Sequence, residues 1–195
     1  MKPVLLIILS YLIGSVPFAY IAAKIKGIDL TKVGSGNIGA TNVWRSVGPP
    51  AGTAVFFLDF FKGYAAVIIA KHLDLAPMAI IVCAAAVIMG HTFSVFLKFK
   101  GGKGVAAGLG VVFGIAPYNF ILCFALGMAI IAVTGYVSLA SITGAAFLSI
   151  LMFSTRQPAP YAWGFLLLAA YVIYKHVPNI KRLLKGTENK ISWKK

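Results

Sequence analysis

A glycine-rich loop with several polar side chains is the first place where this sequence could do chemistry. It reads KVGSGNIGATNVWRSVGPPAG over residues 32–52. Glycines allow close approach of a ligand to the backbone, whose N–H groups can then bind an anion. A guanidinium group, supplied here by Arg45, is a planar fork that suits a phosphate. The candidate ligand-contacting residues in this loop are Ser35, Gly36, Asn37, Thr41, Asn42 and Arg45.

The same loop satisfies the spacing of a dinucleotide-binding fingerprint, which we reject on its context. Gly34, Gly36 and Gly39 match G-x-G-x-x-G, and Asp59 follows twenty residues after Gly39. That fingerprint requires a buried strand before it and a long helix after it. Here an apolar segment of membrane-span length precedes the loop, and Pro49–Pro50 interrupts any helix too soon. Two interpretations of the loop remain. It either binds a phosphate group or is a polar connector whose side chains interact only with one another.

A second glycine-rich loop reads FLKFKGGKGVAAG at residues 96–108. Gly101, Gly102 and Gly104 surround Lys103 just before a predicted helix, where unpaired backbone donors and the helix dipole favour a negative group. The loop is not a Walker A motif, because glycine follows Lys103. The alternative is a flexible basic turn at the membrane surface.

A third polar cluster, KHVPNIKRLLKGTENK, occupies residues 175–190. His176 and Asn179 would share a face if one helix continued across Pro178. A lone histidine at a membrane border is more often a satisfied interfacial residue than a catalyst, and both interpretations stay open for His176. Glu188 lies between lysines and is predicted to hold the tail by ion pairs. The other two histidines, His72 and His91, have weaker claims.

The elements that position these clusters are predicted to be membrane helices. Apolar residues make up 60% of the 195 residues and charged residues only 11%, too few charges for a soluble surface. Both cysteines, Cys83 and Cys123, fall in apolar runs and are predicted to be buried and unpaired. Asp59 and Lys62, three apart within one apolar segment, are expected to face a polar interior or to form a structural pair.

Gaps between charged residues define the spans. Long stretches of low charge cover residues 3–23, 53–70, 75–97, 104–155 and 157–174. The fourth stretch is divided at residues 116–119 and 134–138 into three helices. We predict an all-α, polytopic membrane helix bundle of about seven transmembrane helices, forming one domain over residues 1–195. Five spans would preserve the same sidedness.

Basic residues orient this bundle. With the amino terminus outside and the carboxyl terminus cytoplasmic, 14 of the 18 basic residues face the cytoplasm. All three polar clusters then lie on that side. The net charge of +14 thus favours a membrane side and an anionic substrate over nucleic acid.

Together the three clusters predict a site where a water-soluble phosphorylated compound meets a lipid-soluble one. An organic-anion or phosphate transporter is the alternative function, but it would be expected to show two related halves and polar groups at the bilayer midplane. A structural protein that binds anionic lipid would not need the serine, asparagine and glycine content around Arg45 and Lys103.

At these motifs the sequence resembles the bacterial acyl-phosphate:glycerol-3-phosphate acyltransferases, which are membrane-integral. The resemblance covers nearly the whole chain and rests on SGNIGATNVWRSVG, FKGGKGVA and HVPNIKRLLKGTENK, in that order. Ser94 and Ala107 depart from the proline and threonine common in the family. The resemblance implies seven helices and transfer of an acyl group from acyl phosphate to the sn-1 hydroxyl of glycerol 3-phosphate. The products are lysophosphatidic acid and phosphate, in the first step of phosphatidic acid synthesis.

Site residues follow from the resemblance at the matching positions. Ser35, Arg45, Lys103, His176 and Asn179 are expected to be catalytic, and Glu188 structural. Gly36, Asn37, Thr41, Asn42, Gly101, Gly102 and Gly104 are expected to bind substrate. No cofactor or metal is expected; the partners are the two substrates and membrane lipid, in a bacterial cytoplasmic membrane with the site facing the cytoplasm. The proton acceptor stays open between His176 and a substrate phosphate.

Overall fold

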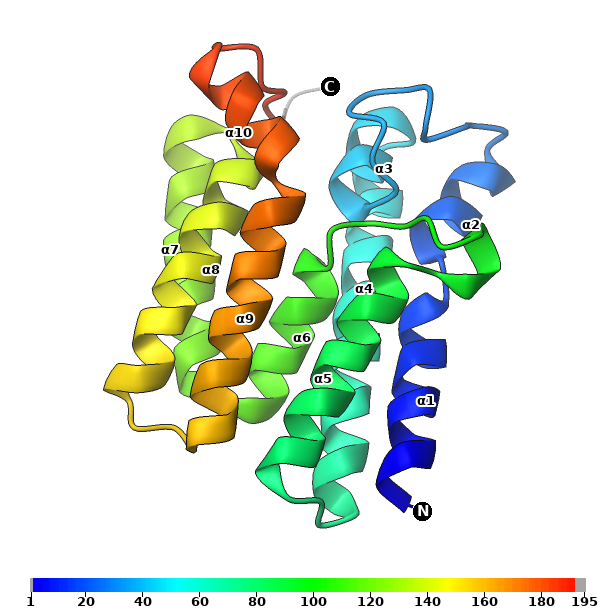
Figure 1. Cartoon of the computed structure of the whole chain (residues 1–195). Helices are drawn as coiled ribbons and strands as arrows, with labels where there is room; N and C mark the ends of the chain where they lie inside the picture. Colours follow the sequence, from blue (N-terminus) through cyan, green and yellow to red (C-terminus); the bar gives the residue numbers. More distant parts are fainter. Residues whose placement is uncertain (1, 192–195) are drawn as a thin grey trace. The chain divides into compact units, whose positions relative to one another are not determined.

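Helices joined by loops and turns make up residues 2–191, which are the residues described by the computed structural model (Figure 1). It divides into two compact units, Met1–Ile115 and Ala116–Lys195. The prediction of a single domain therefore stays a prediction. Lys194 and Lys195, which were counted among the cytoplasmic charges, lie outside the described residues.

The N-terminal unit contains two kinds of helix, long apolar ones and short ones that carry the loops. An unpredicted break at Val16–Pro17 separates the first two helices. Proline lacks an N–H group and disfavours helix at the residue before it, which explains the break. The helices are α1 (Lys2–Ser15), α2 (Phe18–Ile25), α3 (Ala40–Ser46), α4 (Pro49–His72), α5 (Pro77–Thr92), the 3-10 turn η1 (Val95–Leu97) and α6 (Val105–Ile115).

Glycines allow the helices of this unit to approach one another at backbone distance. A Cβ atom at Gly110 of α6 would overlap the Phe60 carbonyl oxygen of α4, and one at Gly63 would overlap the Ala107 carbonyl oxygen. Gly14 and Gly90 make the same kind of approach between α1 and α5. In lipid, where apolar burial drives helices together only weakly, such close contact stabilises helix pairs. This packing fixes the start of α6, and hence the second glycine loop, against α4.

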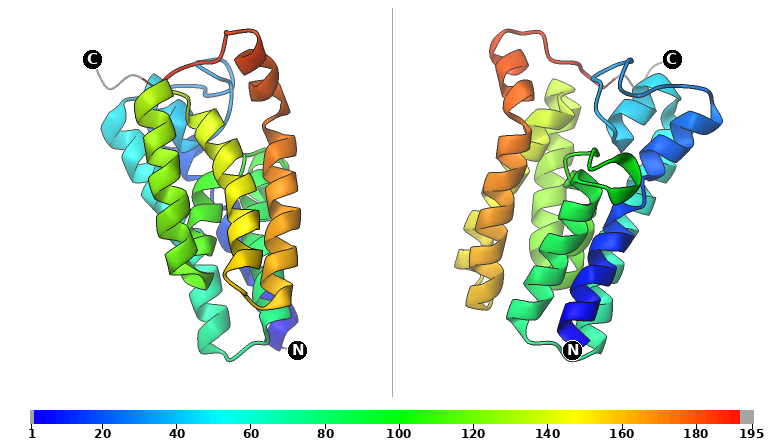
Figure 2. Two further views of the ribbon diagram at one scale, coloured as in Figure 1. Left: turned by 90° about the vertical axis from the view of Figure 1, so that its left-hand side faces the viewer. Right: turned by 45° about the vertical axis from the view of Figure 1, so that its right-hand side comes forward.

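The C-terminal unit is built on three apolar helices. Figure 2 shows α7, α8 and α9 side by side in both views, and α8 packs against both of its neighbours. The predicted divisions at residues 116–119 and 134–138 are confirmed, because α7 begins at Pro117 and Gly135 takes the left-handed conformation that ends it. The helices are α7 (Pro117–Thr134), α8 (Val137–Ser154), α9 (Ala159–Lys175) and α10 (Val177–Leu184).

The outer surface of both units is that of a membrane protein. Large apolar side chains are exposed, including Leu5, Val133 and Leu167 at 69%, 86% and 71%. Among the described residues, four helical segments are long and apolar enough to cross a membrane: Lys2–Ile25, Pro49–His72, Pro117–Thr134 and Val137–Ser154. The all-α membrane class is confirmed, whereas the number of spans and their orientation stay predictions.

Two of the remaining apolar helices in the N-terminal unit, α5 and α6, are shorter than a full span. The 11 residues of α6 rise only about 17 Å, against about 30 Å for the hydrocarbon core of a bilayer. Figure 1 accordingly shows the loop between α5 and α6 set back from the end of α4 that carries α3. The second glycine loop therefore begins within the depth spanned by α4.

Candidate functional site

The first glycine loop is held in shape by the Asn42 side chain. Its Oδ1 accepts the Ser35 backbone N–H at 3.0 Å, and its Nδ2 donates to the carbonyl oxygens of Leu30 and Val33, each at 3.1 Å. Asn42 is 1% exposed. A Cβ atom at Gly34, where φ is +59°, would overlap this Oδ1. The geometry thus assigns Asn42 to loop structure, while its predicted contact with substrate stays a prediction.

The other predicted residues of this loop lie near its surface. Gly36 has φ of +71°, and the backbone N–H of Asn37 lies 3.5 Å from the Ser35 hydroxyl, which accepts it. Thr41 and Arg45 lie on the short helix α3. This helix begins directly after Gly39, whose backbone is extended. Arg45 is half-buried and engaged within the protein. The loop therefore carries hydroxyl, amide and guanidinium groups that are partly exposed.

The second glycine loop is bound to the end of α5. The Gly102 N–H donates to the His91 carbonyl oxygen at 3.2 Å, and a Cβ atom at Gly101 would overlap the same oxygen. Gly104 has φ of +82°, a conformation that favours glycine, and α6 starts directly after it. Lys103 is half-buried between these glycines. This is the predicted arrangement, with a lysine and glycines at a helix N-terminus.

Residues before the loop are bound to α1. The buried Ser94 hydroxyl donates to the Ser15 carbonyl oxygen at 2.5 Å, and the Tyr11 hydroxyl donates to the Phe93 carbonyl oxygen at 2.7 Å. Ser94 thus has a structural role in this chain. It anchors the segment that leads into the glycine loop.

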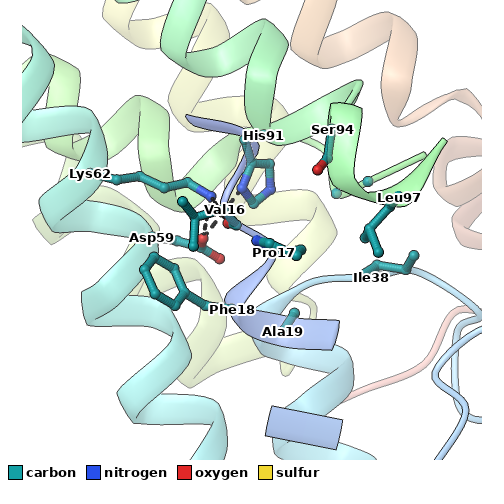
Figure 3. A pocket seen from close by; sticks show the side chains of 12 residues that line it. Val16, Pro17, Phe18, Ala19, Ile38, Asp59, Lys62, His91, Ser94 and Leu97 are labelled. Carbon is teal, nitrogen blue, oxygen red and sulfur yellow. Dashed lines mark hydrogen bonds and ion pairs between the residues drawn. The ribbon is translucent and has the colours of Figure 1, made fainter. Parts of the chain in front are cut away.

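A pocket lies where the two loops meet, within the N-terminal unit (Figure 3). Ile38 of the first loop and Gly101 and Gly102 of the second contribute to its wall. The α1–α2 break forms a further part of it. Of the five predicted catalytic residues, none lines this pocket, so the structure brings the loops together without placing Ser35, Arg45 or Lys103 in its wall.

Three charged or titratable side chains meet at the inner wall of the pocket. Lys62 and His91 converge on Asp59 in Figure 3. The Lys62 Nζ lies 2.7 Å from Asp59 Oδ1, and His91 Nδ1 lies 3.4 Å from the same oxygen. The side chains of Asp59, Lys62 and His91 are only 2%, 4% and 8% exposed. The predicted pairing of Asp59 with Lys62 is confirmed, and His91 joins it.

Sequence reasoning missed His91 because its partner comes from another helix. No carboxylate lies near it in the chain, and Asp59 is 32 positions away. One signal was available: His91 lies ten residues before Gly101, at the end of the helix that leads into the glycine loop. Within the described residues, His91 is thus a histidine whose ring lies against a carboxylate.

The third motif forms a separate arrangement in the C-terminal unit. His176 lies between α9 and α10, whereas Pro178 lies within the first turn of α10. The condition for a shared helix face of His176 and Asn179 is therefore not met. His176 is 3% exposed, and its Nδ1 lies 2.7 Å from the Val172 carbonyl oxygen. A carbonyl can only accept, so Nδ1 carries the proton and Nε2 is the nitrogen that could act as an acceptor in the neutral ring.

Glu188 connects this motif to the rest of the unit. Its carboxylate accepts hydrogen bonds from Ser138 at 2.8 Å, Asn179 at 2.7 Å and Arg182 at 2.6 Å. Burial raises the pKa of Glu188, but these three hydrogen bonds outweigh it and leave the pKa below its ordinary value. The predicted ion pairing is confirmed with Arg182 as the partner, not the neighbouring lysines.

Comparison with known proteins gives one consistent result. The family model described as glycerol-3-phosphate acyltransferase matches residues 4–186. A glycerol-3-phosphate acyltransferase of Desulforamulus reducens is 46% identical over 193 residues, covering 98% of this chain and 96% of the relative. Its counterpart in Aquifex aeolicus is 42% identical over 191 residues, covering 97% of this chain and 100% of the relative.

Solved structures agree. The chain is similar to the crystal structure of PlsY (YgiH), an integral membrane glycerol 3-phosphate acyltransferase, in its glycerol 3-phosphate form. The TM-score is 0.95 at 41% identity, with 98% of this chain and 96% of that chain covered. For the lysophosphatidic acid form the TM-score is 0.91 at 40% identity, with the same coverage. This chain belongs to the family of integral membrane glycerol-3-phosphate acyltransferases.

Proposed function

We propose that this protein transfers a fatty acyl group from acyl phosphate to the sn-1 hydroxyl of glycerol 3-phosphate. The products are lysophosphatidic acid and inorganic phosphate. The observation that carries the proposal is the family match over residues 4–186, which includes Ser35, Arg45, Lys103, His176 and Asn179. The related crystal structures in glycerol 3-phosphate and lysophosphatidic acid forms support the acceptor and the product.

The reaction needs positioning more than activation of the donor. The glycerol hydroxyl oxygen attacks the acyl carbonyl carbon, the bond from that carbon to the phosphate oxygen breaks, and phosphate leaves. Because an acyl phosphate is already activated, holding two anions together in the correct orientation supplies much of the rate. The two glycine-rich basic loops support this requirement, since they combine backbone donors with Arg45 and Lys103.

We assign Arg45 and Lys103 to the phosphate groups of the two substrates, where each would compensate negative charge. Lys103, Gly101, Gly102 and Gly104 are assigned to glycerol 3-phosphate. Ser35 and the first loop are assigned to the same reaction. The hydroxyl proton passes to a substrate phosphate oxygen or to Nε2 of His176, with Asn179 beside it in the chain.

The membrane arrangement is part of the proposal. We infer seven spans, with the amino terminus outside, the carboxyl terminus cytoplasmic, and catalysis at the cytoplasmic face of a bacterial cell membrane. The distribution of basic residues along the chain supports this orientation. The short helix α6 supports a reaction below the membrane surface, where an acyl chain in lipid and a polar acceptor can meet.

An assay with the purified protein and labelled glycerol 3-phosphate tests the proposal. We compare acyl phosphate, acyl-coenzyme A and acyl carrier protein as donors, and expect labelled lysophosphatidic acid with acyl phosphate alone. Product formed from the thioesters at equal rate would contradict the choice of donor. Absence of product with every donor would contradict the function.

A further inference from the structure

We propose that His91 is a positioning residue of this reaction, held by Asp59 and Lys62, and that it holds the second glycine loop in the shape that binds glycerol 3-phosphate. The inference rests on the proposed function, because it takes that loop as the glycerol 3-phosphate site. It concerns a side chain outside the three motifs that carry the family resemblance.

The first step is that the imidazole has one orientation. Its Nδ1 lies 3.4 Å from Asp59 Oδ1, so the buried carboxylate holds the ring by electrostatic attraction and not by a direct hydrogen bond. Asp59 is itself fixed by the Lys62 ammonium group at 2.7 Å. Lys62 in turn donates to the Val16 carbonyl oxygen at 3.1 Å, at the break between α1 and α2. The α4 helix, the α5 helix and the break between α1 and α2 thus determine where the ring points.

The second step is that the ring and backbone of His91 form the support under the loop. A Cβ atom at Gly102 would overlap His91 Nε2, so the loop backbone lies directly against the ring. The Gly102 N–H donates to the His91 carbonyl oxygen at 3.2 Å. Only glycine fits at position 102 beside this histidine, and Lys103 is the next residue. A movement of the ring would therefore be passed to the backbone that presents Lys103.

The third step is that burial of this charged cluster costs free energy that a purely structural role would not require. Removing a carboxylate and an ammonium group from water costs several kcal/mol per ion in proteins, and well-packed apolar residues often stabilise as well or better. Ionisable side chains within membrane helices are rare and usually serve a function. Here the cluster forms the wall of a pocket whose other residues include Ile38, Gly101 and Gly102. The charges therefore lie where they can define the geometry of both loops.

Steady-state kinetics with both substrates tests the proposal. We expect His91→Ala to raise the KM for glycerol 3-phosphate at least about fivefold while the KM for acyl phosphate stays within about twofold. His91→Gln keeps a polar side chain of similar reach and is expected to recover part of this loss. Cys83→Ala is the matched control, because Cys83 is 0% exposed on the same helix but does not line the pocket.

A double variant separates loss of positioning from loss of folding. Asp59→Leu with Lys62→Met removes both buried charges together, so no unpaired ion remains. We expect it to fold and still to raise the KM for glycerol 3-phosphate, because the imidazole has lost the carboxylate beside it. A thermal shift induced by glycerol 3-phosphate should need a correspondingly higher concentration in this variant than in wild type.

Each remaining outcome overturns the inference. Equal changes in both KM values, or kinetics like those of Cys83→Ala, would assign His91 to general packing. Failure of all His91 and Asp59/Lys62 variants to fold, while Cys83→Ala folds, would assign the cluster to stability. In either case wild-type activity with acyl phosphate remains, so this failure is distinct from failure of the proposed function, which would show as an inactive wild-type protein.

Discussion

Polar residues of the glycine loops divide between a side chain that holds the loop backbone and side chains that carry a permanent charge. Asn42 uses both ends of its amide on the loop itself. The side chains of Arg45 and Lys103 are half-buried, and Gly104, which follows Lys103, has a left-handed backbone. A guanidinium or ammonium group can bind a phosphate.

Substitution of these two charges tests that division. We expect Arg45→Ala and Lys103→Ala each to lower kcat/KM at least about tenfold, since a lost charged contact costs about 1.5–3 kcal/mol. Arg45→Lys should recover only part of the loss if the contact is bidentate. Steady-state kinetics on folded protein gives the answer. Near-normal kinetics in both alanine variants would show that the residues only anchor the loops.

For His176 the expected role is positioning of the acceptor hydroxyl. The Val172 carbonyl oxygen lies 2.7 Å from its Nδ1 and fixes the orientation of the ring. We expect His176→Gln to lower kcat while the acidic limb of the kcat profile near pH 6 persists, because phosphate ionises there. The pH profile of kcat, measured from pH 5 to 9, distinguishes a positioning role from a general base. Loss of that limb in the variant, with unchanged substrate binding, would identify His176 as the general base.

The Glu188 carboxylate gives the C-terminal unit a pH dependence of known sign. Its pKa is lowered in the folded protein, so its stabilisation is complete above the ordinary value of 4.5 and is lost as the pH falls through the lowered value. We expect amide hydrogen exchange at residues 186–191 to accelerate below about pH 4.5, after correction for the intrinsic rate. Glu188→Gln should show fast exchange already at pH 7. Asp29→Asn, which changes an exposed carboxylate of the other unit, should leave it unchanged.

At the scale of helices, charge gaps in the sequence predicted most boundaries correctly. The divisions near residues 116 and 135 carry local signals, a proline and a left-handed glycine. The break at Val16–Pro17 was missed because it interrupts an uncharged run, and charge counting does not register it. The meeting of His91 with Asp59 was missed for another reason. It depends on packing between segments far apart in the chain.

Close packing of α4 and α6 makes a prediction for single glycines. We expect Gly110→Ala to destabilise the protein by about 1–3 kcal/mol, because the added methyl group would overlap the Phe60 carbonyl oxygen and force the helices apart. Thermal unfolding in detergent measures the loss. Gly144→Ala is the control, since a Cβ atom there meets nothing within 4 Å. An unchanged unfolding temperature in Gly110→Ala would mean that α6 can move away from α4 at no cost.

At the scale of the whole molecule, the orientation in the membrane can be tested separately for each of the two units. Within the N-terminal unit, Figure 1 shows α3 at the end opposite the turn that joins α4 to α5. The positive-inside argument assigns the first end to the cytoplasm and independently assigns the C-terminal tail to the same side. Agreement between them would support one catalytic face, whereas disagreement would divide the three motifs between the two sides of the membrane.

Labelling of single cysteines by an impermeant thiol reagent decides between these outcomes. In a background of Cys83→Ala and Cys123→Ala, we expect cysteines at Ser46, Lys100 and Thr187 to react only from the cytoplasmic side, and one at Asp74 only from outside. Lys100, Thr187 and Asp74 are exposed, so failure to react from one side reports sidedness rather than burial. The number of membrane crossings between Lys100 and Thr187 must be even if both react from one side. Reaction of these two sites from opposite faces would require an odd number, and would exclude both the seven-span and the five-span arrangement.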